Sequence, residues 1–349
     1  MTMRRWGRSA LGLASVAAAA LSVAGLAANP LAVPFANLGT AEARIALERA
    51  VARRVDAEWL LPRLEVAVAR EDADRAGILL SLAEDHAVPL PDGLRDRAAA
   101  LVSPGRLASL GHCGACALNV SVCRSVQQIV ACALPLELTP VGDLNALRRQ
   151  GVNWAQEQDV DRVETGLALV GLGATAGLVF TGGTSAAIKA GATAARVARA
   201  TGRITPQLSQ VLDDAADIPV AWGRLDDLAL GRAGVSEVTD TARLARLGDL
   251  GRDAGRVYLN TSATDTLVLL RHVEGPEDLA RLARLSDTAG DATRPAVESL
   301  GLARAIRATT RLTDLALAAL GLLVALAVQL LGLVASLLLR AARKGLREG

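Results

Sequence analysis

The sequence predicts a mainly α-helical, membrane-anchored protein, and three observations support this prediction. The 349-residue chain is 51% hydrophobic but only 2% aromatic, so Ala, Leu and Val supply most of its apolar mass. Apolar positions recur at helical spacing between clear Gly and Pro breakers. The chain closes with a long uncharged run and a basic tail. We therefore expect small helical bundles, a glycine-rich helical hairpin and a C-terminal transmembrane helix.

Residues 315–339 carry no charged side chain. A helix rises about 1.5 Å per residue, so this run would be about 37 Å long. The hydrocarbon core of a bilayer is about 30 Å thick and needs about 20 apolar residues. The run therefore predicts a transmembrane helix, followed by a basic tail at residues 340–349.

Residues 1–28 predict an export signal. Arg4, Arg5 and Arg8 form a positive start, and an uncharged apolar stretch follows. This pattern is typical of a cleaved signal peptide, although an uncleaved N-terminal signal anchor stays open. Either interpretation delivers the following residues outside the cytoplasm.

Basic residues flank both predicted membrane segments. Because positive flanks stay in the cytoplasm, both ends of the chain should lie there and the bulk outside. The composition, rich in arginine and alanine, favours a bacterial source. We therefore expect the protein in the bacterial inner membrane, with the bulk of the chain in the periplasm and the C-terminal tail in the cytoplasm. The formal net charge of +2 gives no reason to expect nucleic acid. The expected partners are the lipid bilayer and either a protein partner or another copy, met through helices.

A helical unit with a cysteine cluster is predicted over residues 40–134. Leu47, Val51, Val55 and Trp59 recur at every fourth position, which predicts one helical face, with Thr40 as its N-cap and Pro62 as an interruption. Further short helices follow, separated by the breaker at residues 88–93. Helices this short must pack together to be stable.

The four cysteines fall within 20 residues: Cys113, Cys116, Cys123 and Cys132. Export favours two structural disulfides, and four cysteines allow three pairings. Metal binding and redox chemistry stay open as alternatives, although a second pair nine residues apart suits a zinc knuckle poorly. A bridge between Cys116 and Cys123 would require a break in the helix, because seven residues make two turns.

Residues 165–200 predict the glycine-rich helical hairpin, with arms at about 165–180 and 184–200. Residues 165–188 carry no charge. Small residues recur at every fourth position and let helices approach closely, in membranes especially. The candidate packing positions are Gly173, Gly177, Gly183 and Gly191.

The hairpin is also a candidate membrane segment. Acidic residues precede the hairpin and basic residues follow it, which favours a single membrane crossing by this segment. Such a crossing would place the basic C-terminal tail outside the cytoplasm. The second arm carries Lys189, Arg196 and Arg199, which disfavour hydrocarbon. We expect a hairpin that does not cross.

Residues 201–313 predict a soluble, mainly helical region. The segments at residues 243–249 and 281–287 form a faint repeat, and helical spacing places their leucines on buried faces. Those leucines are Leu244, Leu247, Leu282 and Leu285. Residues 257–259 predict a short extended piece.

Several motifs in the sequence are only weak signals for chemistry. Residues 171–176 match the loose dinucleotide pattern GxGxxA, but no acid follows until Asp213, so close helix packing explains the glycines better. Acidic groups around Asp213 and Asp226 could hold a cation, although helix faces and caps are commoner. The histidines are scattered: His86, His112 and His272. We assign no catalytic, cofactor or metal residue.

The expected role is that of a structural or interaction protein, not an enzyme. The first alternative is a membrane-active or pore-like protein that uses the glycine-rich hairpin. An unrecognised hydrolase is the third candidate.

Overall fold

The computed structural model describes residues 33–102, 113–123, 125–181 and 184–308, together with Leu326 and Gln329. The named elements of this part of the chain are all helical, and its one isolated β-bridge joins Val220 to Thr239. The prediction of a mainly helical protein is confirmed. The chain divides into two compact units, Met1–Ala46 with Arg307–Gly349, and Leu47–Ile306. The second unit contains most of the named helices.

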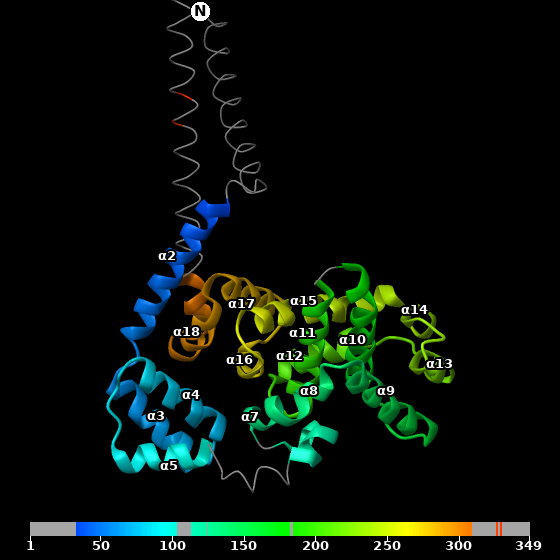
Figure 1. Cartoon of the computed structure of the whole chain (residues 1–349), viewed down its shortest axis with the longest axis horizontal. Helices are drawn as coiled ribbons and strands as arrows, with labels where there is room; N and C mark the ends of the chain where they lie inside the picture. The colour runs from blue at the N-terminus through cyan, green and yellow to red at the C-terminus, as the bar shows by residue number, and fades with distance from the viewer. Residues whose placement is uncertain are drawn as a thin grey trace, which may run out of the picture. The chain divides into compact units, whose positions relative to one another are not determined.

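The first helices of this unit form a small bundle. Helix α2 (Val33–Ala52) contributes its last residues, 47–52, to this unit and is followed by α3 (Ala57–Ala69), α4 (Ala73–Asp85) and α5 (Asp92–Val102). Helices α3, α4 and α5 all contact one another (Figure 1). Asp56 caps α3 by accepting a 2.7 Å hydrogen bond from the backbone N–H of Trp59, and Asp72 caps α4 in the same way.

The apolar stripe of this region is buried, but it belongs to two helices. Leu47 and Val51 lie on α2, whereas Val55 precedes α3 and Trp59 lies within it, and none is more than 6% exposed. Two details of the prediction are wrong. Thr40 lies inside α2 and does not cap it, and Pro62 lies inside α3. The chain breaks earlier, where Asp56 offers a side-chain cap and starts a new helix.

The segment after the bundle is a series of short turns. Residues 113–118 are helical and lead into η2 (Val120–Val122), α7 (Val126–Gln128), the π-helix η3 (Ile129–Ala133) and α8 (Leu134–Glu137). The carboxylate of Asp74 on α4 accepts a 2.8 Å hydrogen bond from the backbone N–H of Val126, and it also forms an ion pair with Arg203 at 2.8 Å. This contact fastens the segment to the bundle.

The longest helices form the centre of the unit. Helix α10 (Arg162–Thr181) packs against α9 (Pro140–Ala155), α11 (Thr184–Ala200), α12 (Pro206–Ala215) and α15 (Thr241–Asn260) (Figure 1). A helix that is apolar on all sides must be buried or lie in a membrane. Where its side chains are described, α10 buries Val163, Leu167 and Leu169 almost completely within the unit. The two arms predicted for the hairpin correspond to α10 and α11.

The remaining elements close the unit around this centre. They are η4 (Trp222–Arg224), α13 (Leu225–Ala229), α14 (Val235–Val238), α16 (Ala263–Leu269), η5 (Leu270–His272), α17 (Pro276–Ala289), η6 (Gly290–Ala292) and α18 (Thr293–Leu300). The four leucines of the faint repeat lie on α15 and α17, and none is more than 7% exposed. Helices α15 and α17 pack against each other. Burial of the repeat leucines is confirmed.

The extended piece predicted at residues 257–259 is wrong, because these residues form the end of α15. Val257 is 1% exposed and continues the buried face that includes Ala254, so tertiary packing outweighs the strand preference of Val and Tyr. Within the described residues, no helix has both the length and the apolar character to span a membrane. The predicted export segment and, but for Leu326 and Gln329, the predicted transmembrane helix lie outside them.

Candidate functional site

The four cysteines form two nested disulfides. The outer disulfide joins Cys113 to Cys132 with a Cα–Cα distance of 5.3 Å, and the inner disulfide joins Cys116 to Cys123 with 4.9 Å. The helical turn ends at residue 118 and η2 then reverses the chain, which is the break that the inner pairing requires. The prediction of disulfide bonds is confirmed, and it leaves no thiol for metal binding.

The predicted packing glycines differ in their surroundings. A Cβ added at Gly191 on α11 would overlap the backbone of Gly251 and Gly255 on α15. Two helix backbones therefore lie in contact there, as small residues permit. A Cβ at Gly173 would make ordinary contact with Val235 at 3.9 Å. The side-chain surroundings of Gly177 and Gly183 lie outside the described residues.

A fully enclosed charge cluster joins α8 and α9 to α11. Its members are Glu137, Asp143, Lys189 and Arg196, none of them more than 5% exposed. Arg196 donates to Asp143 Oδ1 at 2.8 Å and to Glu137 Oε2 at 2.6 Å. Lys189 pairs with Asp143 and also donates to the carbonyl oxygen of Thr139 at 3.2 Å. Two carboxylates thus balance two cations inside the unit.

Burial perturbs the protonation of this cluster. It raises the pKa of the Asp143 carboxyl above its ordinary value, although the charges of Arg196 and Lys189 act in the opposite direction. Burial also lowers the pKa of the Lys189 ammonium, against the charge of Asp143. At 1% exposure, Asp143 is not accessible to a substrate. The cluster is suited to holding helices together.

Glu298 on α18 makes a second buried ionic contact. Its side chain, 2% exposed, accepts a 2.7 Å bond from Arg75 on α4 and lies 3.0 Å from His272 Nε2. Burial raises the pKa of the Glu298 carboxyl, but the hydrogen bond with His272 and the charge of Arg75 outweigh burial, and the net pKa is lowered. This contact ties the bundle to the C-terminal helices.

Within the described residues, the acidic groups around Asp213 and Asp226 do not form a cation site. Asp213 pairs with Arg199 at 3.1 Å, and Asp217 pairs with Arg162 at 2.8 Å. Asp227 pairs with Arg232 at 2.8 Å. Across residues 33–102, 113–123, 125–181 and 184–308, no group of three or more His, Cys, Asp or Glu side chains is placed to hold a metal ion. The glycines at residues 171–176 lie inside α10, where a strand-to-helix turn would be needed for a dinucleotide.

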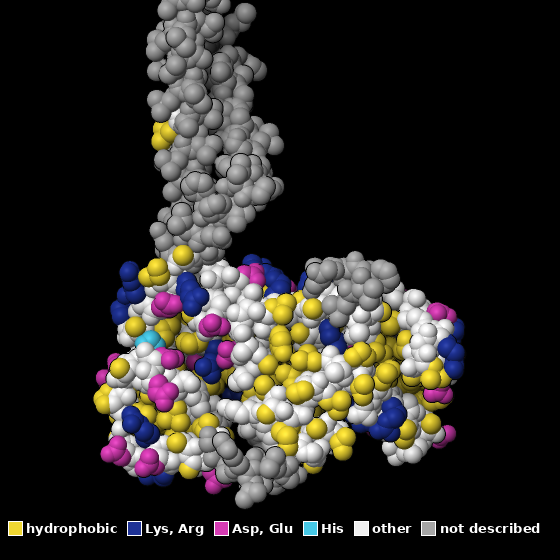
Figure 2. All heavy atoms as spheres, in the orientation of Figure 1, with side chains coloured by type: hydrophobic (Ala, Val, Ile, Leu, Met, Phe, Trp, Pro, Cys, Tyr) yellow, Lys and Arg dark blue, Asp and Glu magenta, His cyan; other side chains and the backbone are white. Residues whose placement is uncertain are grey.

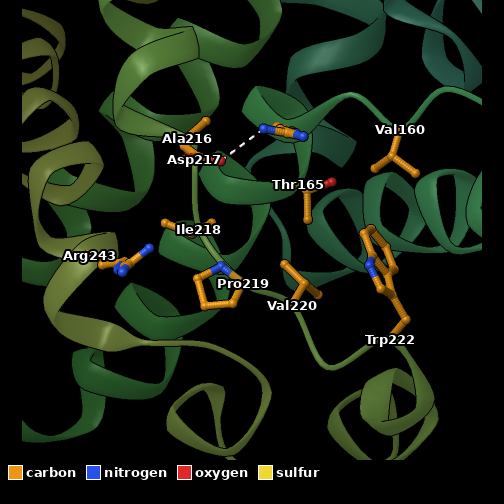
Figure 3. A pocket seen from close by; sticks show the side chains of 10 residues that line it. Val160, Thr165, Ala216, Asp217, Ile218, Pro219, Val220, Trp222 and Arg243 are labelled. Carbon is orange, nitrogen blue, oxygen red and sulfur yellow. Dashed lines mark hydrogen bonds and ion pairs between the residues drawn. The ribbon is translucent and has the colours of Figure 1, made fainter.

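Asp217 lies beside a cavity of about 450 Å³. Figure 3 shows its ion pair at the edge of the cavity, Thr165 on the α10 side and Arg243 on the α15 side. The Thr165 hydroxyl donates to the carbonyl oxygen of Asp161, and the Arg162–Asp217 pair is largely exposed to solvent. Thr165, Arg162 and Asp217 thus already have partners within the protein. Trp222 lines this cavity and also the next one.

That second cavity is an open, largely apolar groove of about 860 Å³, here called the tryptophan groove. Its lining residues are Leu118, Leu136, Val141, Leu144, Asn145, Leu147, Arg148, Gly151, Val152, Trp154, Ala155, Trp222, Gly223, Leu225, Asp226 and Ala229. Hydrophobic side chains lie at the surface over α8, α9 and α13 (Figure 2). The sequence interpretation did not find this site.

The floor of the tryptophan groove is the outer face of α9. Its inner face, with Asp143 and Ala146, is buried against α10 and α11. Its outer face carries Val141 and Val152, which are 57% and 41% exposed. A helix with apolar residues on two opposite faces needs a second contact, and that pattern is the one sequence signal that could have indicated this surface.

Two tryptophans stack beside this floor. The rings of Trp154 and Trp222 lie 6.0 Å apart at an interplanar angle of 12°, while Trp154 stays 51% exposed. Leu118 contributes a third large apolar side chain, 70% exposed. Soluble surfaces seldom expose such contiguous apolar groups unless they bind something.

Comparison with known proteins adds no relative. No family model matches the chain, and neither a curated protein nor a solved structure shows significant similarity to it. The groove and the charge cluster are therefore interpreted from their own geometry.

Proposed function

We propose that the protein is a membrane-anchored structural or interaction protein that binds a protein partner through the tryptophan groove. The observation that carries this proposal is the exposed apolar floor of α9 beside the stacked Trp154 and Trp222. Aromatic side chains on an open apolar surface are characteristic of protein interfaces, where they supply most of the binding energy.

We further propose that the groove lies on the extracytoplasmic side of a bacterial inner membrane. The two disulfides support this location, because such bonds persist in oxidising compartments. The anchor of this arrangement is the apolar run at residues 315–339, with its basic tail in the cytoplasm. Topology reporters fused near residue 230 and after Gly349 test this arrangement. Residue 230 should report from outside and Gly349 from inside; residue 230 inside the cytoplasm would refute it.

The pore-like alternative is not proposed. Gly191 packs against α15, and a Cβ at Gly171 would meet the carboxylate of Asp143 at 2.5 Å. These glycines already have close neighbours inside the unit. Their spacing is therefore explained without association of the hairpin with a second hairpin.

Site-specific photo-crosslinking in intact cells tests the interaction role. A photoreactive phenylalanine at Val152 lies on the groove floor, and one at Leu259 is the matched control, because Leu259 is 59% exposed but lies away from the groove. We expect a discrete protein adduct from position 152 and none from position 259. No adduct from position 152, or the same adduct from both positions, would contradict the proposed function.

A further inference from the structure

Within the part of the chain that the structure describes, two charges that face the tryptophan groove have no oppositely charged partner. Arg148 on α9 is exposed, and among the described residues its guanidinium donates only to the side-chain oxygen of Asn145, at 3.2 and 3.4 Å. Asp226 on α13 is exposed and forms no ion pair with any residue that the structure describes. The pairs Arg149–Glu164, Arg224–Glu237 and Asp227–Arg232 satisfy the charges around them.

This combination makes the groove complementary to itself. An interface with two-fold symmetry joins the same patch on both copies, so any residue i that meets residue j is matched by j meeting i. One unpaired cation and one unpaired anion in the same patch can therefore form two ion pairs across such an interface. A foreign partner would need a matching charge for each, whereas a second copy supplies both.

The shape of the floor fits the same arrangement. Val141, Leu144, Arg148, Val152 and Ala155 follow one face of α9 at intervals of three or four residues. The 16 residues of α9 make a helix about 24 Å long, and Arg148 lies near its middle. In an antiparallel pair the two Arg148 side chains would approach the symmetry axis and repel each other. Asp226 of the second copy removes that repulsion by pairing with each of them.

We propose that the tryptophan groove binds a second copy of this chain in an antiparallel α9–α9 contact, with Arg148 of each copy paired to Asp226 of the other. The proposal rests on the interaction role proposed above and names the partner. It follows that a single charge reversal breaks two ion pairs at once, and that exchanging both charges restores them.

The test is the oligomeric state of the full chain in detergent, measured by sedimentation equilibrium. We expect a dimer for the wild type, and Arg148→Glu or Asp226→Arg to weaken dimerisation at least tenfold. The double variant Arg148→Glu/Asp226→Arg should recover the wild-type affinity. Leu259→Glu changes an exposed apolar residue outside the groove and should leave the dimer intact.

Several results would overturn this proposal. One is a wild-type chain that stays monomeric at a concentration about 100-fold above its concentration in the cells used for crosslinking. Another is a dimer that persists in both Arg148→Glu and Asp226→Arg. If a reversal variant fails to fold, judged by its near-UV circular dichroism, photo-crosslinking from Val152 decides instead. An adduct of two identical chains supports the inference. An adduct with a different protein overturns it but retains the interaction role, and no adduct refutes both.

Discussion

Two glycines of α15 should respond in opposite directions to the same substitution. A Cβ added at Gly255 would overlap the carbonyl group of Ala187 on α11, whereas a Cβ added at Gly248 meets nothing within 4 Å. Alanine in a helix interior is favoured over glycine by about 1 kcal/mol. Gly248→Ala should therefore raise the free energy of unfolding by up to about 1 kcal/mol.

Gly255→Ala gains the same helix propensity but forces two backbones apart. Overpacking ordinarily costs about 1–3 kcal/mol, and the upper end applies here because a backbone carbonyl cannot rotate out of the way. Helix α11 must shift, so Gly191 and the buried alanines of α11 lose contact with α15. We expect a net loss of about 2 kcal/mol, and hence a difference of about 3 kcal/mol between the two variants.

Urea unfolding of the full chain in detergent, followed by far-UV circular dichroism with the disulfides oxidised, measures both effects. A change of midpoint at constant slope reports stability alone. Gly248→Ala is the matched control, since it places the same methyl group on the same helix. A Gly255→Ala variant that unfolds at or above the wild-type midpoint would refute the close contact between α11 and α15.

Three further perturbations test other contacts. Lys189→Met removes one of the two cations that pair with the buried carboxylate of Asp143, which should lower the free energy of unfolding in urea by about 3–5 kcal/mol. Arg162→Met breaks an exposed ion pair and should lower it by less than about 1 kcal/mol. Equal losses in the two variants would contradict burial of the cluster. Glu298 has a lowered pKa in the folded state, so its contribution is complete above the ordinary value of 4.5 and is lost as the pH falls through the folded pKa. Wild-type protein should therefore lose more stability between pH 7 and pH 3 than Glu298→Gln, and parallel losses in the two proteins would count against this contact. Replacing both cysteines of the outer disulfide by alanine should cost about 0.9 kcal/mol more than the same change in the inner disulfide, because the sequence separations are 19 and 7 residues; the reverse order of midpoints would refute the loop-entropy argument.

Local signals in the sequence were sufficient for the helical fold class and for several of the buried helix faces. The buried leucines of α15 and α17 depend on neighbours within a few residues, and periodicity detects those, whereas the cap at Asp56 that starts α3 was missed. Prediction went wrong where tertiary packing decides. The strand preference of residues 257–259 yields to the buried face of α15, and Pro62 is accommodated within α3.

The surfaces and clusters depend on residues far apart in the chain. Lys189 is 46 residues from Asp143, so the sequence indicates a charged arm but not the acid that lets it be buried. Trp154 and Trp222 come from different helices, and no pattern in either segment predicts that they stack. The cysteines were the exception, because their number and export context favour pairing without knowledge of the fold.

The stacked tryptophans also make the groove optically distinct. The chain has four tryptophans, and Trp59 is 6% exposed and lies under the guanidinium of Arg63. Its emission should stay constant when the surface of the molecule changes. Trp154 is half in water, so any occupant of the groove should shift its fluorescence to shorter wavelength, and separation of the two rings should alter their coupled ultraviolet circular dichroism. The protein thus carries its own spectroscopic probe at the surface where binding is proposed, and occupancy can be followed without a label.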